Sequence, residues 1–335
     1  MKRDPYMDNL RCLLIFLVVL AHFLSKLPSI NEYQYLHNFI YIFHMPLFVF
    51  VSGYFSKHIV KNGVFQSQRL LSIFWLFCIF KGMTHLIYCI YNGFYSLKLL
   101  DVSSAPWYLI CLCLWYLMIP FIRYYKPKLV LICSFVIAIL VGYDQTVGQF
   151  LSLSRAIVFF PFFLIGYYLS NDQLKNLLEK RLRIPAALLL LGAFILSLLK
   201  GDVISPYIRF TYGASSYASI LKEDYLLRGP VLRLTWYVIA IILSVSVMYL
   251  IPRCHRWFTY IGQRTLSIYI LHILIRNVLV YEGFFDALMR QPKVYTLSVF
   301  FLCIGIVLIC SCSIIYKPFS YLMSHPFFIK PKKNR

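Results

Sequence analysis

Apolar residues occupy most of the chain in runs of about 20 residues, with short polar segments between them. Runs of this length are typical of transmembrane helices, whereas membrane β-strands alternate apolar and polar positions over about ten residues. We expect helices at residues 9–27, 37–56, 70–92, 105–122, 129–147, 150–170, 185–200, 235–251, 265–282 and 294–316. The pattern predicts one all-α, polytopic membrane domain over residues 1–335, built as a bundle of about ten transmembrane helices.

The distribution of Lys and Arg predicts how this bundle is oriented. An even number of spans puts both termini on one side, and about twice as many basic residues fall on that side as on the other. Cytoplasmic loops are enriched in Lys and Arg, so both termini are predicted to be cytoplasmic. The formal net charge of +21 thus has a topological explanation, and we expect no nucleic-acid partner.

Composition excludes a soluble globular protein and a disordered one, and the cysteine positions indicate neither a disulfide framework nor a zinc site. With 61% hydrophobic and 13% charged residues, the chain is neither a soluble globular protein nor a disordered one. The ten cysteines lie mostly inside apolar runs, which indicates small hydrophobic residues in helices and not a disulfide framework. Cys111 and Cys113 have no His or Cys pair at zinc spacing, so no metal site is predicted. The first span lacks a small-residue cleavage site, which predicts an uncleaved helix.

Ionisable side chains within the apolar spans are the strongest functional signal. Such a group costs several kcal/mol in a bilayer unless it is paired or hydrated, so each one is a candidate functional residue. The candidates are Arg11, His22, His44, Lys81, His85, Arg155 and His272. His37, His58, His255 and His325 lie at boundaries or in loops, where we expect them to be solvated.

Arg11, His22 and His44 form the central group of this prediction. Arg11 and His22 are separated by about three helical turns and about 16 Å, so both point to nearly one face. His44 lies about as far from the outer end of its span as His22 does, so the two imidazoles could meet at one depth. A neutral histidine can take a proton from a hydroxyl, as general base catalysis requires. Packing within the bundle is the alternative role for each histidine.

The remaining candidates have open alternatives. Arg155 lies close to the depth of the two histidines and could stabilise an oxyanion or orient an anionic group, or it could pair with Asp144. Lys81 lies near mid-bilayer and is expected to face water or a partner. Packing and site roles are equally compatible with His272. The aromatic and polar residues of segment 201–234 suit either a sugar acceptor or a membrane interface.

Several motifs resemble acyltransferase family 3, a family of integral membrane O-acyltransferases. They are Arg11-x10-His22, PheHisMetProLeuPhe-x3-SerGlyTyrPhe at 43–55, TrpTyrLeu at 107–109, ProPhePheLeuIleGlyTyrTyr at 161–168 and IleGlyGlnArgThrLeuSerIleTyrIleLeuHis at 261–272. They look most like the branch of fucose 4-O-acetylases and capsule polysaccharide O-acetyltransferases. The resemblance covers nearly the whole chain and follows the family order.

This resemblance implies transfer of an acetyl or other short acyl group to a hydroxyl of a cell-envelope or capsular polysaccharide sugar. The donor would be cytoplasmic acetyl-CoA or another acyl-CoA, used as a substrate, with no bound cofactor. Arg11, His22 and His44 match catalytic positions of the family, and His272 matches its late histidine. Arg155 and Lys81 are additional candidates for substrate binding or oxyanion stabilisation.

The expected partners are acyl-CoA, an envelope glycan or lipid-linked sugar, the bilayer of the cell membrane and, as a further candidate, glycan-synthesis machinery. A transporter or flippase of a lipid-linked glycan or amphipathic solute is the alternative, because it also explains intramembrane charges and broken helices. A third possibility is a non-catalytic subunit of a glycan-synthesis complex.

Overall fold

The computed structural model of the chain is almost entirely helical, and it describes residues 4–27, 31–102, 104–148, 150–179, 182–290 and 296–324. The long helices are α1 (Pro5–Leu24), α2 (Asn31–Phe55), α3 (Ser67–Asn92), α4 (Trp107–Ile122), α5 (Pro127–Leu140), α6 (Leu153–Tyr168), α8 (Arg183–Leu199), α10 (Gly229–Leu250), α12 (Thr265–Tyr281), α14 (Thr296–Ser311) and α15 (Ser313–Ser324). The short helices are α7 (Asn171–Glu179), α9 (Gly201–Ile204), α11 (Thr259–Gln263), α13 (Phe284–Met289) and the 3₁₀ turns η1 (Val141–Tyr143), η2 (Ser205–Tyr212), η3 (Tyr217–Ser219) and η4 (Glu223–Arg228). Two-residue strands β1 (Val60–Lys61) and β2 (Val64–Phe65) form an antiparallel hairpin between α2 and α3.

Each of the ten predicted spans overlaps an apolar helix of the structure, so the helical class is confirmed. Among the described residues, four helices are long and apolar enough to cross a membrane alone, and up to seven if each of three bent pairs is one span. Three further apolar helices, within 107–122, 127–143 and 265–281, are shorter. The number of crossings and the side of the termini therefore stay predictions.

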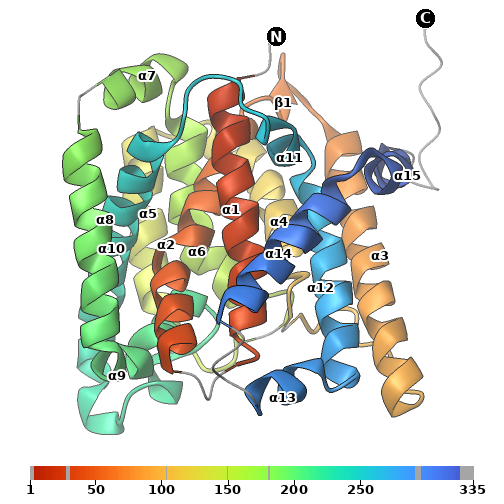
Figure 1. The fold of residues 1–335 in the computed structure, drawn as a ribbon. Coiled ribbons are helices and arrows are strands. Elements are labelled where there is room, and N and C mark those ends of the chain that lie inside the picture. The colour runs from red at the N-terminus through yellow and green to blue at the C-terminus, as the bar shows by residue number, and fades with distance from the viewer. Residues whose placement is uncertain are drawn as a thin grey trace, which may run out of the picture.

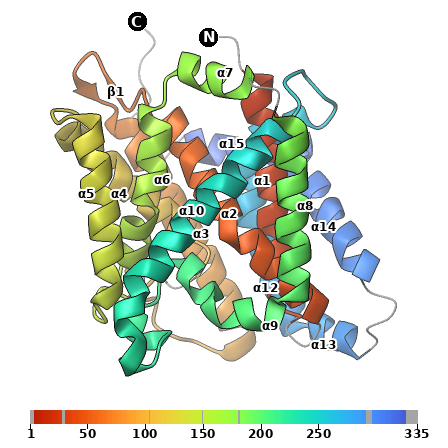
Figure 2. The ribbon, with the colours of Figure 1, turned by 90° about the vertical axis from the view of Figure 1, so that its left-hand side faces the viewer.

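The bundle has two distinct ends, which Figures 1 and 2 show from two directions. The start of α1, the β-hairpin, α7, α11 and α15 lie at one end, called here the α7 end. α9 and α13 lie at the other end, called the α13 end. α1 runs through the middle of the bundle, and several of its apolar side chains, such as Leu10, Leu14 and Val19, are fully buried. An arginine and a histidine on α1 are therefore held inside the protein.

Local sequence explains where α1 begins. The Asp4 carboxylate accepts a hydrogen bond of 2.9 Å from the backbone N–H of Tyr6, and Pro5 occupies the first helical position. An acidic N-cap followed by proline is a strong helix start, because the cap satisfies a free N–H and proline has none to satisfy. The start of α1 is thus fixed, and so is the depth of the side chains that follow.

Two glycines let α2 and α6 approach closely. A Cβ at Gly53 would lie 1.9 Å from the carbonyl oxygen of Phe163, and one at Gly166 would lie 2.0 Å from that of Phe50. Small residues at a helix crossing allow the two backbones to meet, which is a common way to pack membrane helices. The SerGlyTyrPhe and LeuIleGlyTyrTyr motifs therefore meet in space, where they position α2 against α6.

Pro46 lies inside α2 without ending it. Proline lacks an N–H, so the carbonyl of Ile42, four residues earlier, loses its helical partner. The indole Nε1 of Trp236 on α10 donates to that carbonyl at 3.1 Å. A side chain from a neighbouring helix thus satisfies the freed group, and α2 continues past His44 to Phe55.

Candidate functional site

Two cavities lie at opposite ends of the bundle and share walls from α1, α2, α4 and α12. The first, called the Arg11 cavity, has a volume of about 610 Å³ and is lined by Arg11, Phe48, Val51, Ser52, Phe55, Arg69, Ser72, Ile73, Tyr108, Leu109, Leu112, Tyr116, Thr265, Leu266 and Tyr269. The second, called the His22 cavity, has a volume of about 300 Å³ and is lined by His22, Ser25, His37, Tyr41, His44, Met45, Ser104, Ala105, Trp107, Arg155, Phe159, Thr211, Tyr212 and Arg276. Their sizes fall within the range of small-molecule sites.

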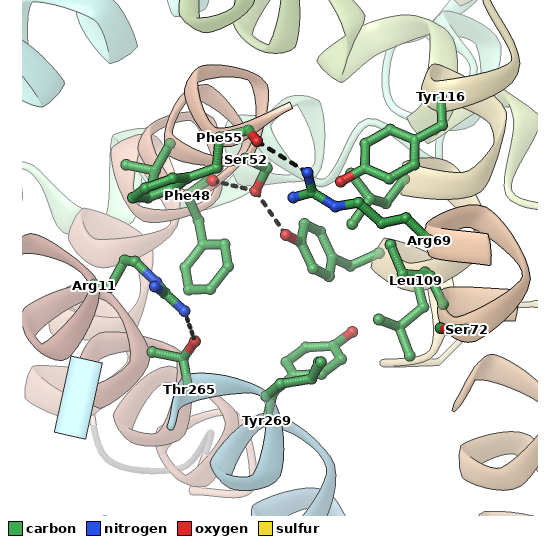
Figure 3. Close-up of a pocket in the computed structure, with 15 residues that line it drawn as sticks. Arg11, Phe48, Ser52, Phe55, Arg69, Ser72, Leu109, Tyr116, Thr265 and Tyr269 are labelled. Carbon is green, nitrogen blue, oxygen red and sulfur yellow. Dashed lines mark hydrogen bonds between the residues drawn. The ribbon is translucent and has the colours of Figure 1, made fainter. Parts of the chain in front are cut away.

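Two arginines approach the Arg11 cavity from opposite sides, Arg11 from α1 and Arg69 from α3 (Figure 3). Phe55 lies between them. The Arg11 guanidinium lies over its ring at 5.5 Å, and Nη1 of Arg69 donates to its carbonyl at 3.2 Å. The rest of the lining is largely apolar, so this end of the bundle presents a cationic entrance to an apolar chamber.

Arg11 is held by groups on three helices. Its Nη1 lies 3.4 Å from the carboxylate of Asp8, and its Nη2 donates to the Thr265 hydroxyl at 3.0 Å. The buried Asp8 also accepts a hydrogen bond of 3.1 Å from Gln263. A Cβ at Gly262 would lie 1.7 Å from the Asp8 carbonyl oxygen, so α11 packs directly on the backbone of α1. The IleGlyGlnArg motif thus supports Arg11.

The wall between the two cavities contains Tyr108, Tyr269 and Ala105. The two tyrosines line the Arg11 cavity, and Ala105 lines the His22 cavity. The hydroxyl of Tyr269 donates to the carbonyl of Ala105, and the two tyrosine rings meet edge to face at 5.6 Å. Ser52 and Tyr108 share a hydrogen bond of 2.6 Å. A ligand passing from one cavity to the other would therefore have to pass these rings.

His22 lies in a cluster of basic groups at the α13 end of α1. Its ring lies 5.3 Å from that of His272, and its Nδ1 lies 3.3 Å from Nη1 of Arg276. Arg276 also donates from Nη2 to Asn277 at 2.7 Å. His272 and Arg276 are one turn apart on α12, so this helix presents both groups to α1.

Hydrogen bonds fix which ring nitrogen of each histidine carries the proton. Nδ1 of His44 lies 2.8 Å from the Ile40 carbonyl, and Nδ1 of His272 lies 2.8 Å from the Ile268 carbonyl. A carbonyl only accepts, so both Nδ1 atoms are donors and both Nε2 atoms of the neutral rings are acceptors. A guanidinium only donates, so the neutral ring of His22 accepts at Nδ1 and carries its proton on Nε2. The His22 cavity thus holds a histidine of each tautomer.

Arg155 reaches the His22 cavity from the start of α6. It donates from Nε to the Tyr212 carbonyl at 3.3 Å and from Nη1 to the Val102 carbonyl at 3.4 Å, and it lies over the Trp107 ring at 5.4 Å. The Asp144 carboxylate instead accepts from Thr146 and Val147 in its own loop. Arg155 therefore belongs to the wall of the cavity.

The structure brings together His22, His44 and Arg155 of the predicted site residues, because all three line one cavity. His272 lies behind His22, fully buried, and its Nε2 has no hydrogen-bond partner among the described residues. Arg11 lines the other cavity. Lys81 lines neither of them. Its amine donates to the Asp101 carbonyl at 2.5 Å.

Sequence reasoning missed three ionisable residues that line the cavities, namely Arg69, Arg276 and His37, whereas Tyr212 lies in the segment 201–234 that was considered for a sugar acceptor. His37 was expected to be solvated, which is wrong, because it is 6% exposed and packs on Tyr41 with ring centres 4.2 Å apart. The expectation for His325 falls outside the described residues. Arg276 lies one turn after His272 within a predicted span, and that position is a signal that could have identified it.

A family model described as an acyltransferase domain matches residues 4–317 of this chain, which is nearly its full length. It includes every helix that contributes to the two cavities. No curated protein and no solved structure matches the chain.

Proposed function

The chain belongs to acyltransferase family 3, and on that premise we propose that it is a multi-pass protein of the cell membrane. It would transfer an acetyl or other short acyl group from cytoplasmic acyl-CoA to a hydroxyl of a cell-envelope or capsular polysaccharide sugar. The observation that carries this proposal is the pair of cavities, one cationic and apolar at the α7 end, the other rich in histidine at the α13 end. A donor that enters from one end and an acceptor that enters from the other would each have a chamber, and the two chambers adjoin at Tyr108, Tyr269 and Ala105.

The Arg11 cavity suits the donor. The phosphates of CoA cannot enter the bilayer, so they would stay at the entrance, where guanidinium groups are good phosphate ligands. Arg11 and Arg69 line that entrance, and the apolar chamber behind them would accommodate the pantetheine arm. The thioester would then pass Tyr108 and Tyr269 to reach His22. This placement requires the α7 end to be cytoplasmic, as the charge distribution predicts.

The His22 cavity suits the transfer step. Nε2 of His44 would take the proton of the acceptor hydroxyl as its oxygen attacks the thioester carbon. The Nε2–H of neutral His22 would donate a hydrogen bond to the oxyanion of the tetrahedral intermediate. This intermediate would collapse with loss of the CoA thiolate, which would receive the proton that His44 took from the hydroxyl. The products are the ester and CoA, and both histidines end in their starting protonation states. The tautomers thus favour His44 for the base role that the sequence assigned first to His22.

Arg155 would position the acceptor or stabilise the oxyanion of the tetrahedral intermediate from the cavity wall. His272, beside His22, would act as a positioning residue. Transfer through an acyl-His22 intermediate is a second route to the same products. Trapping an acyl group on His22 under single-turnover conditions would distinguish it from direct attack.

The experiment that tests this function is an NMR comparison of surface polysaccharide esters. Cells would carry the wild-type gene, a deletion, His22→Ala, or His58→Ala as a control at an exposed histidine. Loss of one O-acyl signal in the deletion and in His22→Ala, with the signal kept in His58→Ala, is the expected result. An unchanged ester pattern in the deletion with less polymer at the surface would instead support the transporter or flippase.

A further inference from the structure

The His22 cavity carries cationic and basic groups without acidic ones. Its lining includes the guanidinium groups of Arg155 and Arg276 and the imidazoles of three histidines, His22, His37 and His44. No Asp or Glu lies among the described residues that line it. By contrast, Arg11 in the other cavity pairs with the buried carboxylate of Asp8. The buried Arg11 thus has a carboxylate beside it, whereas neither arginine of the His22 cavity has an acidic side chain beside it in the described lining.

Arg276 is the clearest part of this imbalance. One terminal nitrogen donates to the neutral amide of Asn277 and the other contacts His22. Its Nε is buried and has no hydrogen-bond partner among the described residues. A guanidinium in a low-dielectric site without a paired anion is costly, and such groups in membrane helices normally mark a ligand or ion path.

A transient oxyanion does not account for two guanidinium groups. The tetrahedral intermediate carries a single negative charge and exists only during the reaction. The Nε2 proton of His22 already offers one donor for developing negative charge. An anion that is present throughout, on the substrate itself, would neutralise the second cation in the bound complex.

We propose that the acceptor is an anionic sugar, with a carboxylate or phosphate group held between Arg276 and Arg155 in the His22 cavity. This inference rests on the proposed function, because it names the substrate class of the same site. The rings of Trp107, Tyr41 and Tyr212 line the remaining wall and provide apolar faces beside the charged pair. The fork of N–H donors on a guanidinium fits two oxygens of a carboxylate or phosphate. Arg276 and Arg155 would therefore select a negatively charged sugar and orient its reacting hydroxyl.

The test is a comparison of charged and neutral acceptors with the full-length protein in nanodiscs of phosphatidylcholine, which has no net charge. The probes are methyl β-glucuronide, its neutral primary amide, methyl β-glucoside and glucose 1-phosphate. Equilibrium binding is measured first, and acetyl transfer from labelled acetyl-CoA second. We expect the glucuronide, the sugar phosphate or both to bind at least about tenfold more tightly than the neutral sugars, since a charged hydrogen bond is lost in the amide.

The variants are Arg276→Gln, Arg155→Gln and Arg228→Gln. Arg228 is exposed on η4, away from the cavity lining, so its substitution removes the same charge as a control. We expect the preference for anionic probes to fall below about twofold in Arg276→Gln or Arg155→Gln and to persist in Arg228→Gln. The wild-type comparison of glucuronide and amide needs no variant, so it stands even if a substituted protein does not fold.

The outcomes separate the inference from the proposed function. Equal binding of charged and neutral sugars, no saturable binding of any anionic probe, or a preference that survives both cavity substitutions would overturn the inference. Binding of anionic sugars without any ester product, together with an unchanged ester pattern in the deletion strain, would overturn the acyltransferase function and leave an anion-binding cavity. Preference for the glucuronide over the sugar phosphate would identify a uronic acid as the acceptor, and the reverse would identify the phosphate of a lipid-linked sugar.

Discussion

Nη1 of Arg276 lies 3.3 Å from Nδ1 of His22, although the two residues are 254 positions apart. α1 and α12 pack side by side, and this contact joins the end of one helix to the end of the other. Because arginine can only donate, the contact turns the proton of neutral His22 to Nε2. His44 is held in the opposite tautomer by the Ile40 carbonyl. His44 is therefore suited to accept a proton at Nε2, and His22 is suited to donate a hydrogen bond from Nε2.

Glutamine substitutions test this division of roles. Glutamine has an N–H donor but no basic lone pair on nitrogen, so His44→Gln should lower kcat by about 10²-fold or more, as expected for loss of a general base. His22→Gln should lose less, because glutamine keeps a donor at that position. Steady-state transfer from acetyl-CoA by purified protein measures both.

His58→Gln, at an exposed position, is the matched control and should retain full activity. A larger loss in His22→Gln than in His44→Gln would restore His22 as the base. Equal elution of all three variants in size-exclusion chromatography shows that the comparison concerns chemistry and not folding.

The candidate site could be predicted in part from the cost of burying ionisable groups. That rule identified His22, His44 and Arg155, which do line one cavity. It did not separate Arg11 from His22, because helical spacing gives a shared face but not the Tyr108 and Tyr269 barrier contributed by two other helices. Such contacts depend on tertiary packing, which periodicity along one helix does not contain.

Arg69 should act in donor binding and not in the chemical step. It lines the entrance of the Arg11 cavity, whereas the histidines line the other cavity, so Arg69→Gln should raise the KM for acetyl-CoA about tenfold with kcat nearly unchanged. Arg123→Gln is the control, since Arg123 is exposed beyond the end of α4, over the ring of Tyr124, and outside both linings. An unchanged KM, or the same change in both variants, would exclude Arg69 from the donor site.

Tyr269 should limit the size of the acyl group. Its ring, held by the hydrogen bond to the Ala105 carbonyl, restricts the path of the acyl group between the cavities. Tyr269→Ala should therefore increase the ratio of butyryl to acetyl transfer by several-fold. Competition between the two CoA esters in one reaction measures the ratio directly. Tyr269→Phe keeps the ring and should leave the ratio near that of the wild type. A ratio unaffected in both variants would mean that the thioester takes another path.

The fold was more predictable than the site, because hydropathy reports burial in lipid directly. All ten predicted spans overlap apolar helices, yet the prediction could not show that several are short or bent. The pair Leu153–Tyr168 and Asn171–Glu179, for example, is bent by 92°. Arg233 falls just before the predicted span 235–251, but it is fully buried within α10, where its guanidinium lies over the Tyr217 ring at 5.1 Å. Burial of this kind depends on a neighbour that hydropathy does not consider.

Alanine substitutions at two glycines should change the stability of the protein in opposite directions, because Gly53 lies at the crossing of α2 and α6 and Gly192 lies in open space on α8. Gly53→Ala places a Cβ within 1.9 Å of the Phe163 carbonyl, so the backbones must separate, at a cost of about 1–3 kcal/mol. Gly192 on α8 has nothing within 4 Å of such a Cβ, and alanine favours the helix there by about 0.5–1 kcal/mol. Thermal unfolding in one detergent should therefore show a lower Tm for Gly53→Ala and an unchanged or higher Tm for Gly192→Ala.

Since α2 carries His44 and α6 carries Arg155, Gly53→Ala should also lower transfer activity in the protein that remains folded. A Tm for Gly53→Ala at or above that of the wild type would show that the two helices are not packed backbone to backbone.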